Sequence, residues 1–153
     1  MPSRVIAVCT SKNKGERKTS VEQVELRKEY GIVGDAHAGN WHRQISLLAK
    51  ESINKMHALG LDVDNGDFAE NLTTEGIDLP KLPIGTRLQI GDCLLEITQI
   101  GKECHTRCAI YHQAGDCVMP KEGVFAKVLQ GGKLQPGSLI LNIPAGHSTK
   151  VKG

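Results

Sequence analysis

The sequence predicts a mostly β fold, a closed or partly closed β-barrel with one or two short helices. Glycine is abundant, at 17 residues, and it separates short apolar runs, which is the pattern of many short strands joined by turns. Aromatic residues make up only 3%, so the core must rest on Ile, Leu and Val. Closing the sheet would remove exposed strand edges, which is why we expect a barrel.

The expected strands follow the runs of Val, Ile and Leu along the chain. The clearest pair is a hairpin, with a Gly-Asp turn between two arms at Arg87–Ile90 and Cys93–Ile100. Val124–Gln130 fits a helix or a strand, and the two glycines that follow favour a strand and a tight turn. The other expected strands are Arg4–Thr10, an extended segment over residues 21–31, residues 44–48 and residues 138–143.

One segment has the pattern of a helix. Within residues 50–59 the apolar residues Ile53, Met56 and Leu59 recur at helical spacing. Gly60 stands where a glycine commonly ends a helix. The expected turn-rich segments are residues 66–74 and 76–83.

Composition and charge restrict the class of protein. The chain has 153 residues, 39% hydrophobic and 24% charged, and we expect one domain over residues 1–153, with a core at about 4–143 and a tail at 144–153. A net charge of +2 with few aromatics does not favour nucleic acid, but it is compatible with a local pocket for an anion. No apolar run has the length of a signal or membrane segment, so we expect a cytoplasmic protein with no nucleic-acid or membrane partner.

Two of the cysteines have the surroundings of core residues. The five cysteines cannot all pair with one another, and the sequence shows no secretion signal. We therefore expect free thiols and not a disulfide framework. Cys9 and Cys93 each lie within a strand-like apolar run, where cysteine packs as a small apolar residue. We therefore expect both to be buried.

The other three cysteines, Cys104, Cys108 and Cys117, lie in a polar stretch after the hairpin. Positive charge from His105 and Arg107 favours the thiolate, which is the nucleophile and the metal ligand. Three interpretations are open at this point: a reactive thiol that carries sulfur or bonds a soft metal, a zinc site, or packing in the core. The spacing C-x3-C-x8-C contains no C-x2-C pair, so it is a weak signal for zinc.

A polar loop bordered by glycines forms a second cluster, with Asp35, His37, His42 and Arg43. Such a loop lets backbone N–H groups approach an anion, and His and Arg add charge and hydrogen-bond donors. The alternative interpretation is a solvated loop with an Asp35–Arg43 ion pair.

Several motifs together resemble one known family, the MOSC domains found at the C-terminus of molybdenum cofactor sulfurases and as stand-alone bacterial proteins. Residues 34–48, with GDAHAG followed by RQISLL, look like the first signature of the family. Residues 66–79, GDFAENLTTEGIDL, are similar to its central G-x-F-x-E-N-L motif. The cysteine that the family places after its next strand falls on Cys104. The other similar segments are residues 82–91, 123–129 and 134–138.

The resemblance implies a barrel related to the small barrel domain of pyruvate kinases, and a role in molybdenum cofactor metabolism. MOSC domains are associated with binding the pterin cofactor or receiving sulfur on a cysteine. The implied ligand is the molybdenum cofactor (molybdopterin) or molybdate, and the implied partners are a sulfur donor and a molybdoenzyme acceptor. Pyridoxal phosphate belongs to a separate domain of the fused sulfurases, for which this chain has no room, and we do not expect it here.

On this resemblance the reactive thiolate is Cys104, and His105 and Arg107 would lower its pKa and orient a negatively charged group. The chain departs from the common pattern, because GKE precedes Cys104 where many members have Arg and Pro. The additional Cys108 and Cys117 could resolve a persulfide or, together with Cys104, ligate a metal.

The resemblance also assigns a cofactor-binding set. Arg43 and His37 would hold the pterin phosphate or an oxyanion such as molybdate, with Asp35 orienting one of them. Glu70 and Asn71 would hydrogen-bond the pterin or brace their own loop. The complete expected set is Asp35, His37, His42, Arg43, Glu70 and Asn71.

Two alternatives to a sulfur carrier or sulfurtransferase remain open. One is a non-catalytic module whose cysteines hold zinc or another soft metal. The other is a module that binds molybdate or the cofactor without turnover. The central geometric expectation is that the Asp35–Arg43 loop and the Cys104 loop form one site.

Overall fold

The computed structural model describes residues 3–13, 17–60, 62–101 and 122–144. This part of the chain contains eleven strands, one α-helix and one short 3-10 helix. Their bounds are β1 Arg4–Thr10, β2 Thr19–Val21, β3 Val24–Arg27, β4 Gly31–Ile32, β5 Ile45–Ala49, α1 Lys50–Ala58, β6 Leu72–Glu75, η1 Leu79–Lys81, β7 Arg87–Ile90, β8 Cys93–Ile100, β9 Val124–Gln130, β10 Gly132–Leu134 and β11 Ile140–Ile143.

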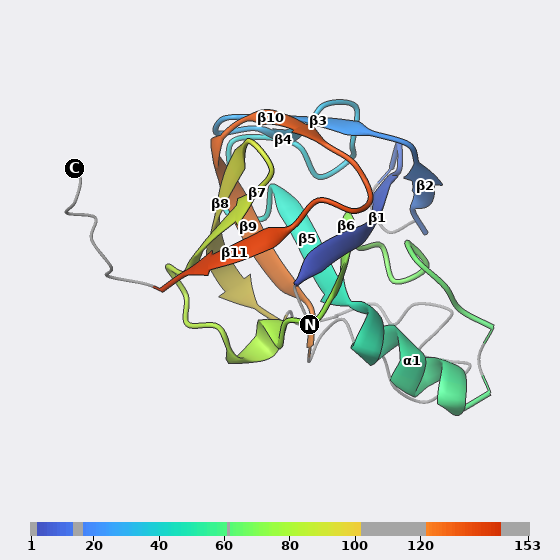
Figure 1. Cartoon of the computed structure of the whole chain (residues 1–153). Helices are drawn as coiled ribbons and strands as arrows, with labels where there is room; N and C mark the ends of the chain where they lie inside the picture. The colour runs from blue at the N-terminus through green and yellow to red at the C-terminus, as the bar shows by residue number, and fades with distance from the viewer. Residues whose placement is uncertain (1–2, 14–16, 61, 102–121, 145–153) are drawn as a thin grey trace.

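The strands form two sheets (Figure 1). The larger has eight strands in the order β11-β7-β8-β9-β5-β6-β1-β2, and the smaller has three in the order β10-β3-β4. Strands β5 and β6 run parallel, whereas the other pairs are antiparallel. Parallel neighbours need a crossover connection, and α1 forms part of it. In Figure 1 the smaller sheet lies across one end of the larger sheet, and α1 lies towards the other end.

A short set of contacts links the two ends of the larger sheet. Arg4 of β1 pairs with Leu139, just before β11. The backbone of Val5 donates to Ser138 O at 2.9 Å and accepts from Gly137 N at 2.7 Å. The mostly β class is confirmed, while closure of the sheet into a full barrel stays a prediction.

The core consists mainly of Ile, Leu and Val, as the composition predicts. Along β8 the buried positions alternate, with Cys93, Leu95 and Ile97 fully buried. Cys9 and Cys93 carry free thiols and have 0% exposure, which confirms their interpretation as core residues. Burial raises the pKa of each of these two thiols to about 11, so both stay protonated at neutral pH.

The predicted helix is confirmed as α1. Ile53 and Met56 are buried, because they lie on the face that packs on the sheet. Leu59 lies beyond the last turn and is 69% exposed, so the apolar face ends earlier than its spacing suggested. Gly60 follows with a φ of +96°, a left-handed conformation that glycine adopts readily. In the described residues no helix is long and apolar enough to cross a membrane.

Two other local predictions need correction. The segment at residues 66–74 is not turn-rich throughout, because β6 begins within it. Thr73 and Thr74 of β6 are fully buried between β5 and β1, a setting in which β-branched side chains pack well. The extended segment predicted over residues 21–31 is divided into separate short strands, and Glu29, at φ 56°, lies in the turn before β4. Val124–Gln130 is a strand, as the glycines after it favoured.

Candidate functional site

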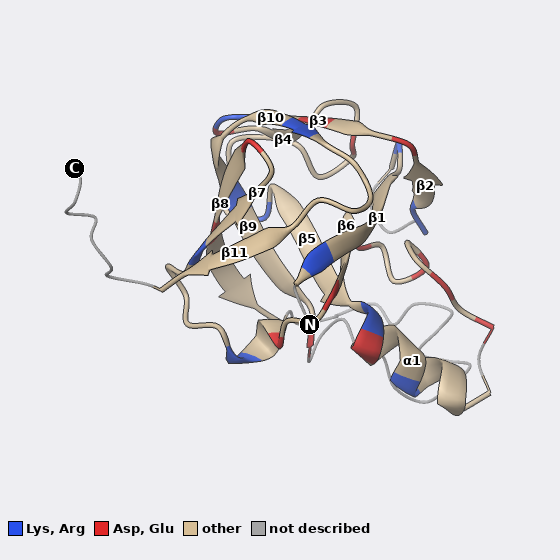
Figure 2. Ribbon diagram, viewed as in Figure 1, with Lys and Arg blue, Asp and Glu red and all other residues tan. Residues whose placement is uncertain are grey.

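Charged residues of both signs are interspersed over the described strands and loops (Figure 2). Several form ion pairs at the surface, such as Arg4 with Glu75 at 2.8 Å, where the Arg4 side chain is 50% exposed. Exposed pairs of this kind contribute little to stability. A buried ion pair, between Lys18 and Asp35, is different and defines the centre of the candidate site.

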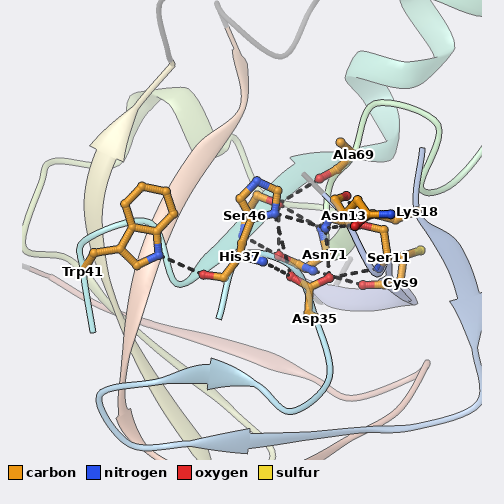
Figure 3. Close-up of polar contacts among 10 residues, drawn as sticks. All are labelled: Cys9, Ser11, Asn13, Lys18, Asp35, His37, Trp41, Ser46, Ala69 and Asn71. Carbon is orange, nitrogen blue, oxygen red and sulfur yellow. Dashed lines mark hydrogen bonds and ion pairs between the residues drawn. The ribbon is translucent and has the colours of Figure 1, made fainter. Parts of the chain in front are cut away.

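Lys18 and Asp35 come from the loops that follow β1 and β4. Lys18 Nζ donates to Asp35 Oδ1 at 2.9 Å, and both side chains have 0% exposure. The backbone N–H of Ser11 donates to Oδ1 at 3.0 Å, and that of His37 donates to Oδ2 at 3.0 Å. Figure 3 shows Lys18, Ser11 and His37 grouped around the Asp35 carboxylate.

The environment of Asp35 favours its charged form. Burial alone would raise the pKa of Asp35, because it disfavours the carboxylate. Hydrogen bonds from the backbone N–H of His37 and from Lys18 Nζ outweigh burial and hold the pKa of this carboxyl well below its usual range. Asp35 is therefore ionised at neutral pH and balances the ammonium of Lys18. The Asp35–Arg43 ion pair considered from the sequence is wrong, because Asp35 pairs with Lys18 instead.

Sequence reasoning missed Lys18. It lies at residues 11–19, a stretch with the composition of a solvated basic loop. The backbone fixes it, because Lys18 N donates to Gly66 O at 2.7 Å. Gly66 has a φ of +85°, and a Cβ there would lie 2.2 Å from Lys18 O, so only glycine permits this approach. The one signal in the sequence is that glycine, which opens the G-x-F-x-E-N-L motif.

Arg43 and His42 lie against the end of β8. Arg43 Nε donates to Gln99 Oε1 at 3.0 Å, and His42 Nε2 donates to the same oxygen at 2.9 Å. Gln99 Nε2 in turn donates to Gly101 O at 2.7 Å, which directs Oε1 towards these two side chains. The Arg43 guanidinium also lies 5.3 Å from the centre of the Phe125 ring, within cation–π range.

Trp41 connects this group to the buried ion pair. Its Nε1 donates to His37 O at 2.8 Å (Figure 3). The Trp41 and His37 rings are parallel within 2°, with centroids 6.5 Å apart, and Arg43 lies 6.0 Å from the Trp41 ring centre. The loop from Asp35 to Arg43 is thus one connected unit that brings together the four residues predicted from it.

Glu70 lies in the turn before β6 and is fully buried. Its carboxyl accepts hydrogen bonds from Thr73 Oγ1 at 2.7 Å, Gly66 N at 2.8 Å and Phe68 N at 3.3 Å. Burial raises the pKa of Glu70, and these hydrogen bonds offset only part of that effect.

Asn71, also fully buried, directly precedes β6 and connects it to β5 and β1. Its Oδ1 accepts from Ser46 N at 3.0 Å, and its Nδ2 donates to Cys9 O at 3.1 Å. The polar atoms of Glu70 and Asn71 are used within the fold. Of the two roles considered for this pair, these contacts favour bracing of the loop.

The stretch that contains Cys104 leaves and rejoins the larger sheet at one place. Gly101 N donates to Gly123 O at 2.6 Å, and Ile100 pairs with Val124. Within the described ranges, no group of three or more His, Cys, Asp or Glu residues is arranged to hold a metal ion. The predicted residues Cys104, His105, Arg107, Cys108 and Cys117 lie outside the described residues.

A separate pocket of about 540 Å³ lies between α1 and η1. Its polar groups pair with one another, since Ser52 Oγ and Lys55 Nζ donate to Glu122 at 2.5 and 2.9 Å. No described residue that was predicted for the site lines this pocket. We therefore place the candidate site at the Lys18–Arg43 region and not at α1.

Solved structures of bacterial proteins share this arrangement of strands. YuaD from Bacillus subtilis superposes with a TM-score of 0.75 at 18% identity, covering 92% of this chain and 94% of YuaD. YiiM from Geobacillus stearothermophilus gives 0.69 at 19% identity, covering 96% and 78%. YiiM from Escherichia coli gives 0.63 at 18% identity, covering 93% and 68%. At these identities the likeness shows the fold alone, and a comparison with curated proteins finds no match.

The strand order thus defines a β-rich domain of the kind seen in YuaD and YiiM. The MOSC domain family matches residues 34–140, which is more than half of the chain. The chain therefore belongs to the MOSC domain family. The matched range includes the Asp35–Arg43 loop, Glu70, Asn71 and the Cys104 stretch.

Proposed function

We propose that this protein acts in molybdenum cofactor metabolism, where it binds the cofactor or molybdate and carries sulfur on Cys104. The supporting observation is that Arg43 and His42 are held by Gln99, next to the ends of the Cys104 stretch. Cys104 follows Gly101 by three residues. Because consecutive Cα atoms are 3.8 Å apart, the chain tethers it within about 11 Å of Gly101.

The donor set of the loop fits an anionic ligand. Gln99 holds Arg43 through Nε, a contact that does not use the two terminal nitrogens of the guanidinium. Those nitrogens belong to the fork that matches phosphates and other oxyanions. His37 adds a ring N–H from the neighbouring group. The molybdenum cofactor carries a phosphate and molybdate is an oxyanion, so these residues fit either ligand, and the bound cofactor would supply the molybdenum that finally takes up sulfur.

The proposed sulfur step is an exchange at a thiol. The thiolate of Cys104 attacks the outer sulfur of a donor persulfide, a new S–S bond forms on Cys104, and the donor leaves as a thiolate. This exchange needs no outside oxidant or reductant. His105 and Arg107 supply positive charge that favours the attacking thiolate. The proposed partners are a persulfide donor and a molybdoenzyme acceptor in the cytoplasm.

The first experiment tests the thiol. The protein is incubated with a small-molecule persulfide, and the gain of sulfur is measured by mass spectrometry of the intact chain. Cys104→Ala is expected to lose the gain. Cys93→Val is the matched control and is expected to retain it, because the Cys93 thiol is buried and its pKa is about 11. Undiminished loading in Cys104→Ala would refute the carrier role.

The second experiment tests the anion site by equilibrium binding of the molybdenum cofactor. Arg43→Gln is expected to weaken binding about tenfold or more, because it removes a charged hydrogen-bond donor. Arg27→Gln is the control, since the Arg27 side chain is 61% exposed on β3 and pairs with Glu25. Equal binding by both variants would refute the site.

Two further cysteine variants, together with those above, separate the alternatives. Stoichiometric zinc in the purified protein that disappears with Cys108→Ala or Cys117→Ala would assign a non-catalytic metal-binding module. Cofactor binding that depends on Arg43 without any sulfur gain at Cys104 would assign a binding module without turnover.

A further inference from the structure

We infer that buried Lys18 fixes the tautomer of His37, so that the ring presents Nε2–H as a hydrogen-bond donor and is barred from ligating a metal. This inference rests on the proposed function only for the identity of the ligand. The arrangement of Lys18, Asp35 and His37 defines it without any ligand. Lys18 is thereby a positioning residue that acts through His37.

The distances decide which partner the imidazole has. His37 Nδ1 lies 3.1 Å from Lys18 Nζ but 3.7 Å from Asp35 Oδ2. The longer distance is outside the normal hydrogen-bond range. An ammonium group has three donors and no acceptor, so Nδ1 must accept from Lys18. The proton of the neutral ring then resides on Nε2.

The hydrogen-bond count around Nζ supports the same assignment. Lys18 Nζ contacts three acceptors, which are Asp35 Oδ1 at 2.9 Å, Ser11 Oγ at 2.9 Å and His37 Nδ1 at 3.1 Å. Ser11 Oγ donates its own proton to Asn13 O at 3.0 Å, which leaves a lone pair of Oγ for the ammonium. Three N–H donors therefore meet three acceptors, with each proton used once.

The ring is also held in place by the backbone on which it sits. His37 N donates to Asp35 Oδ2 at 3.0 Å, and His37 O accepts from Trp41 Nε1 at 2.8 Å. The imidazole is 15% exposed, whereas the side chains of Lys18 and Asp35 are fully buried. Nδ1 thus faces the buried ammonium, and the ring can meet a ligand only through its other edge.

The fixed tautomer selects the chemistry of that ligand. A metal would need a lone pair on Nε2, which in the neutral ring requires the proton on Nδ1. A protonated Nδ1 would then face the N–H groups of Lys18, so that two hydrogen-bond donors would meet with no acceptor between them. An oxygen acceptor such as a phosphate or a molybdate oxygen has no such conflict. His37 is therefore a donor to an oxyanion and not a metal ligand.

The test is nitrogen-15 NMR of the histidine side chains in the ligand-free protein at neutral pH, with the His37 signals assigned by a His37→Gln variant. The expected result is a protonated Nε2 and an unprotonated Nδ1. A proton on Nδ1, in either the neutral or the doubly protonated ring, would overturn the inference. Addition of one equivalent of zinc is expected to leave these signals unchanged, and coordination of zinc by His37 would also overturn it.

Lys18→Met tests the cause. Without the ammonium, Nδ1 is expected to gain a proton and donate it to Asp35, so the protonated nitrogen shifts from Nε2 to Nδ1 or both become protonated. Lys50→Met is the matched control, because Lys50 pairs with Asp64 at the surface, and it is expected to leave His37 unchanged. An unprotonated Nδ1 in a folded Lys18→Met protein would overturn the role of Lys18. If this variant does not fold, the wild-type and zinc measurements still decide the inference.

The outcome is separable from that of the proposed function. Loss of sulfur loading or of cofactor binding would refute the proposed function and leave the tautomer assignment standing. A protonated Nδ1 in the wild-type protein would refute the tautomer assignment and leave Cys104 and Arg43 untouched.

Discussion

Asp35 and Glu70 are both buried carboxyls in loops, yet their surroundings give them opposite characters. Asp35 lies against the ammonium of Lys18 at 2.9 Å, and its pKa is held below the usual range. Glu70 is surrounded by a hydroxyl and two backbone N–H groups, and burial raises its pKa. Neutral hydrogen-bond donors thus hold a buried carboxyl in place but do not offset the desolvation of its charged form, whereas a buried cation keeps the carboxyl ionised.

The comparison separates a candidate binding residue from a structural one. The family resemblance placed Asp35 and Glu70 in one cofactor-binding set. The ionised Asp35 positions Lys18 and His37, and one edge of the His37 ring is available to a ligand. The contacts of Glu70 all lie within its own turn, from Gly66 to Thr73.

Gly66 connects the two regions. Its N–H donates to Glu70 at 2.8 Å, and its carbonyl accepts from Lys18 N at 2.7 Å. The turn that Glu70 braces therefore positions the backbone of the residue that neutralises Asp35. We expect a substitution at these positions to lower the free energy of unfolding more when it breaks more of these contacts.

The largest expected effect is that of Gly66→Ala, which disturbs both regions. The added Cβ would lie 2.2 Å from Lys18 O, and alanine would be strained at φ +85°. We expect a loss on the order of 4 kcal/mol in the free energy of unfolding, from overpacking and left-handed strain together. Urea denaturation measures it, and Gly34→Ala is the control, because a Cβ there meets nothing within 4 Å at a similar φ of +86°. Equal losses in the two variants would show that the contact with Lys18 is unimportant.

Asp35→Asn breaks the charged region alone. The amide cannot neutralise Lys18, whose ammonium is left buried and unpaired, so the expected loss is about 3 kcal/mol. The double variant Lys18→Met/Asp35→Leu removes both charges and should recover most of that loss. A double variant as unstable as Asp35→Asn would contradict the ion-pair explanation.

The pH dependence of stability should have opposite signs at the two carboxyls. The folded pKa of Asp35 is depressed, so its contribution is present above the unfolded pKa of about 3.9 and is lost as pH falls below it. The folded pKa of Glu70 is raised, so stability is lost as pH rises from about 4.3 through the folded pKa. Each group can change stability by at most about 1.4 kcal/mol per pH unit. Unfolding series on wild type, Asp35→Asn and Glu70→Gln measure the two slopes, and slopes of the same sign would contradict the comparison.

Glu70→Gln should be milder than Asp35→Asn. The glutamine oxygen can still accept from Gly66 and Thr73, while its amino group faces the N–H of Phe68 and loses that hydrogen bond. We expect a loss of about 1 kcal/mol at neutral pH, measured by urea denaturation. A loss as large as that of Asp35→Asn would remove the distinction between neutral and charged bracing.

The smallest expected effect on stability is that of Gln99→Leu. Gln99 holds Arg43 and His42 near the surface, so its loss should change the free energy of unfolding by only about 0.5 kcal/mol. Cofactor binding should nevertheless weaken about tenfold, because Arg43 is no longer oriented. Gln89→Leu is the control, since the Gln89 side chain donates to Gly91 O in the hairpin turn. Unchanged binding in Gln99→Leu would remove Gln99 from the site.

Most of the sheet could be predicted from sequence because its local signals agree. The hairpin of β7 and β8 has alternating burial and a Gly-Asp turn, and both of its arms appear with the predicted bounds. β6 was not predicted, because Thr73 and Thr74 are polar residues that become buried only when β1 and β5 pair with β6 on both sides. Long-range pairing, and not local pattern, creates that strand.

The candidate site could be predicted only in part, for a related reason. Asp35, His37, His42 and Arg43 lie in one loop, where glycine and charge make a local signal. Their partners Lys18 and Gln99 come from distant parts of the chain, and nothing in their own surroundings distinguishes them from solvated residues. A buried lysine is revealed only when the loops that enclose it are placed together.

The hydrogen bond between Gly101 and Gly123 has a consequence for how such domains can diversify. It fixes the two ends of residues 102–122 on adjacent, paired strands, so the sheet does not depend on the length of the chain between them. Each doubling of a flexible loop costs only about 0.6 kcal/mol in closure entropy. Segments with different numbers of cysteines could therefore be exchanged at this point, and the thiol chemistry could change while the Asp35–Arg43 loop stays the same.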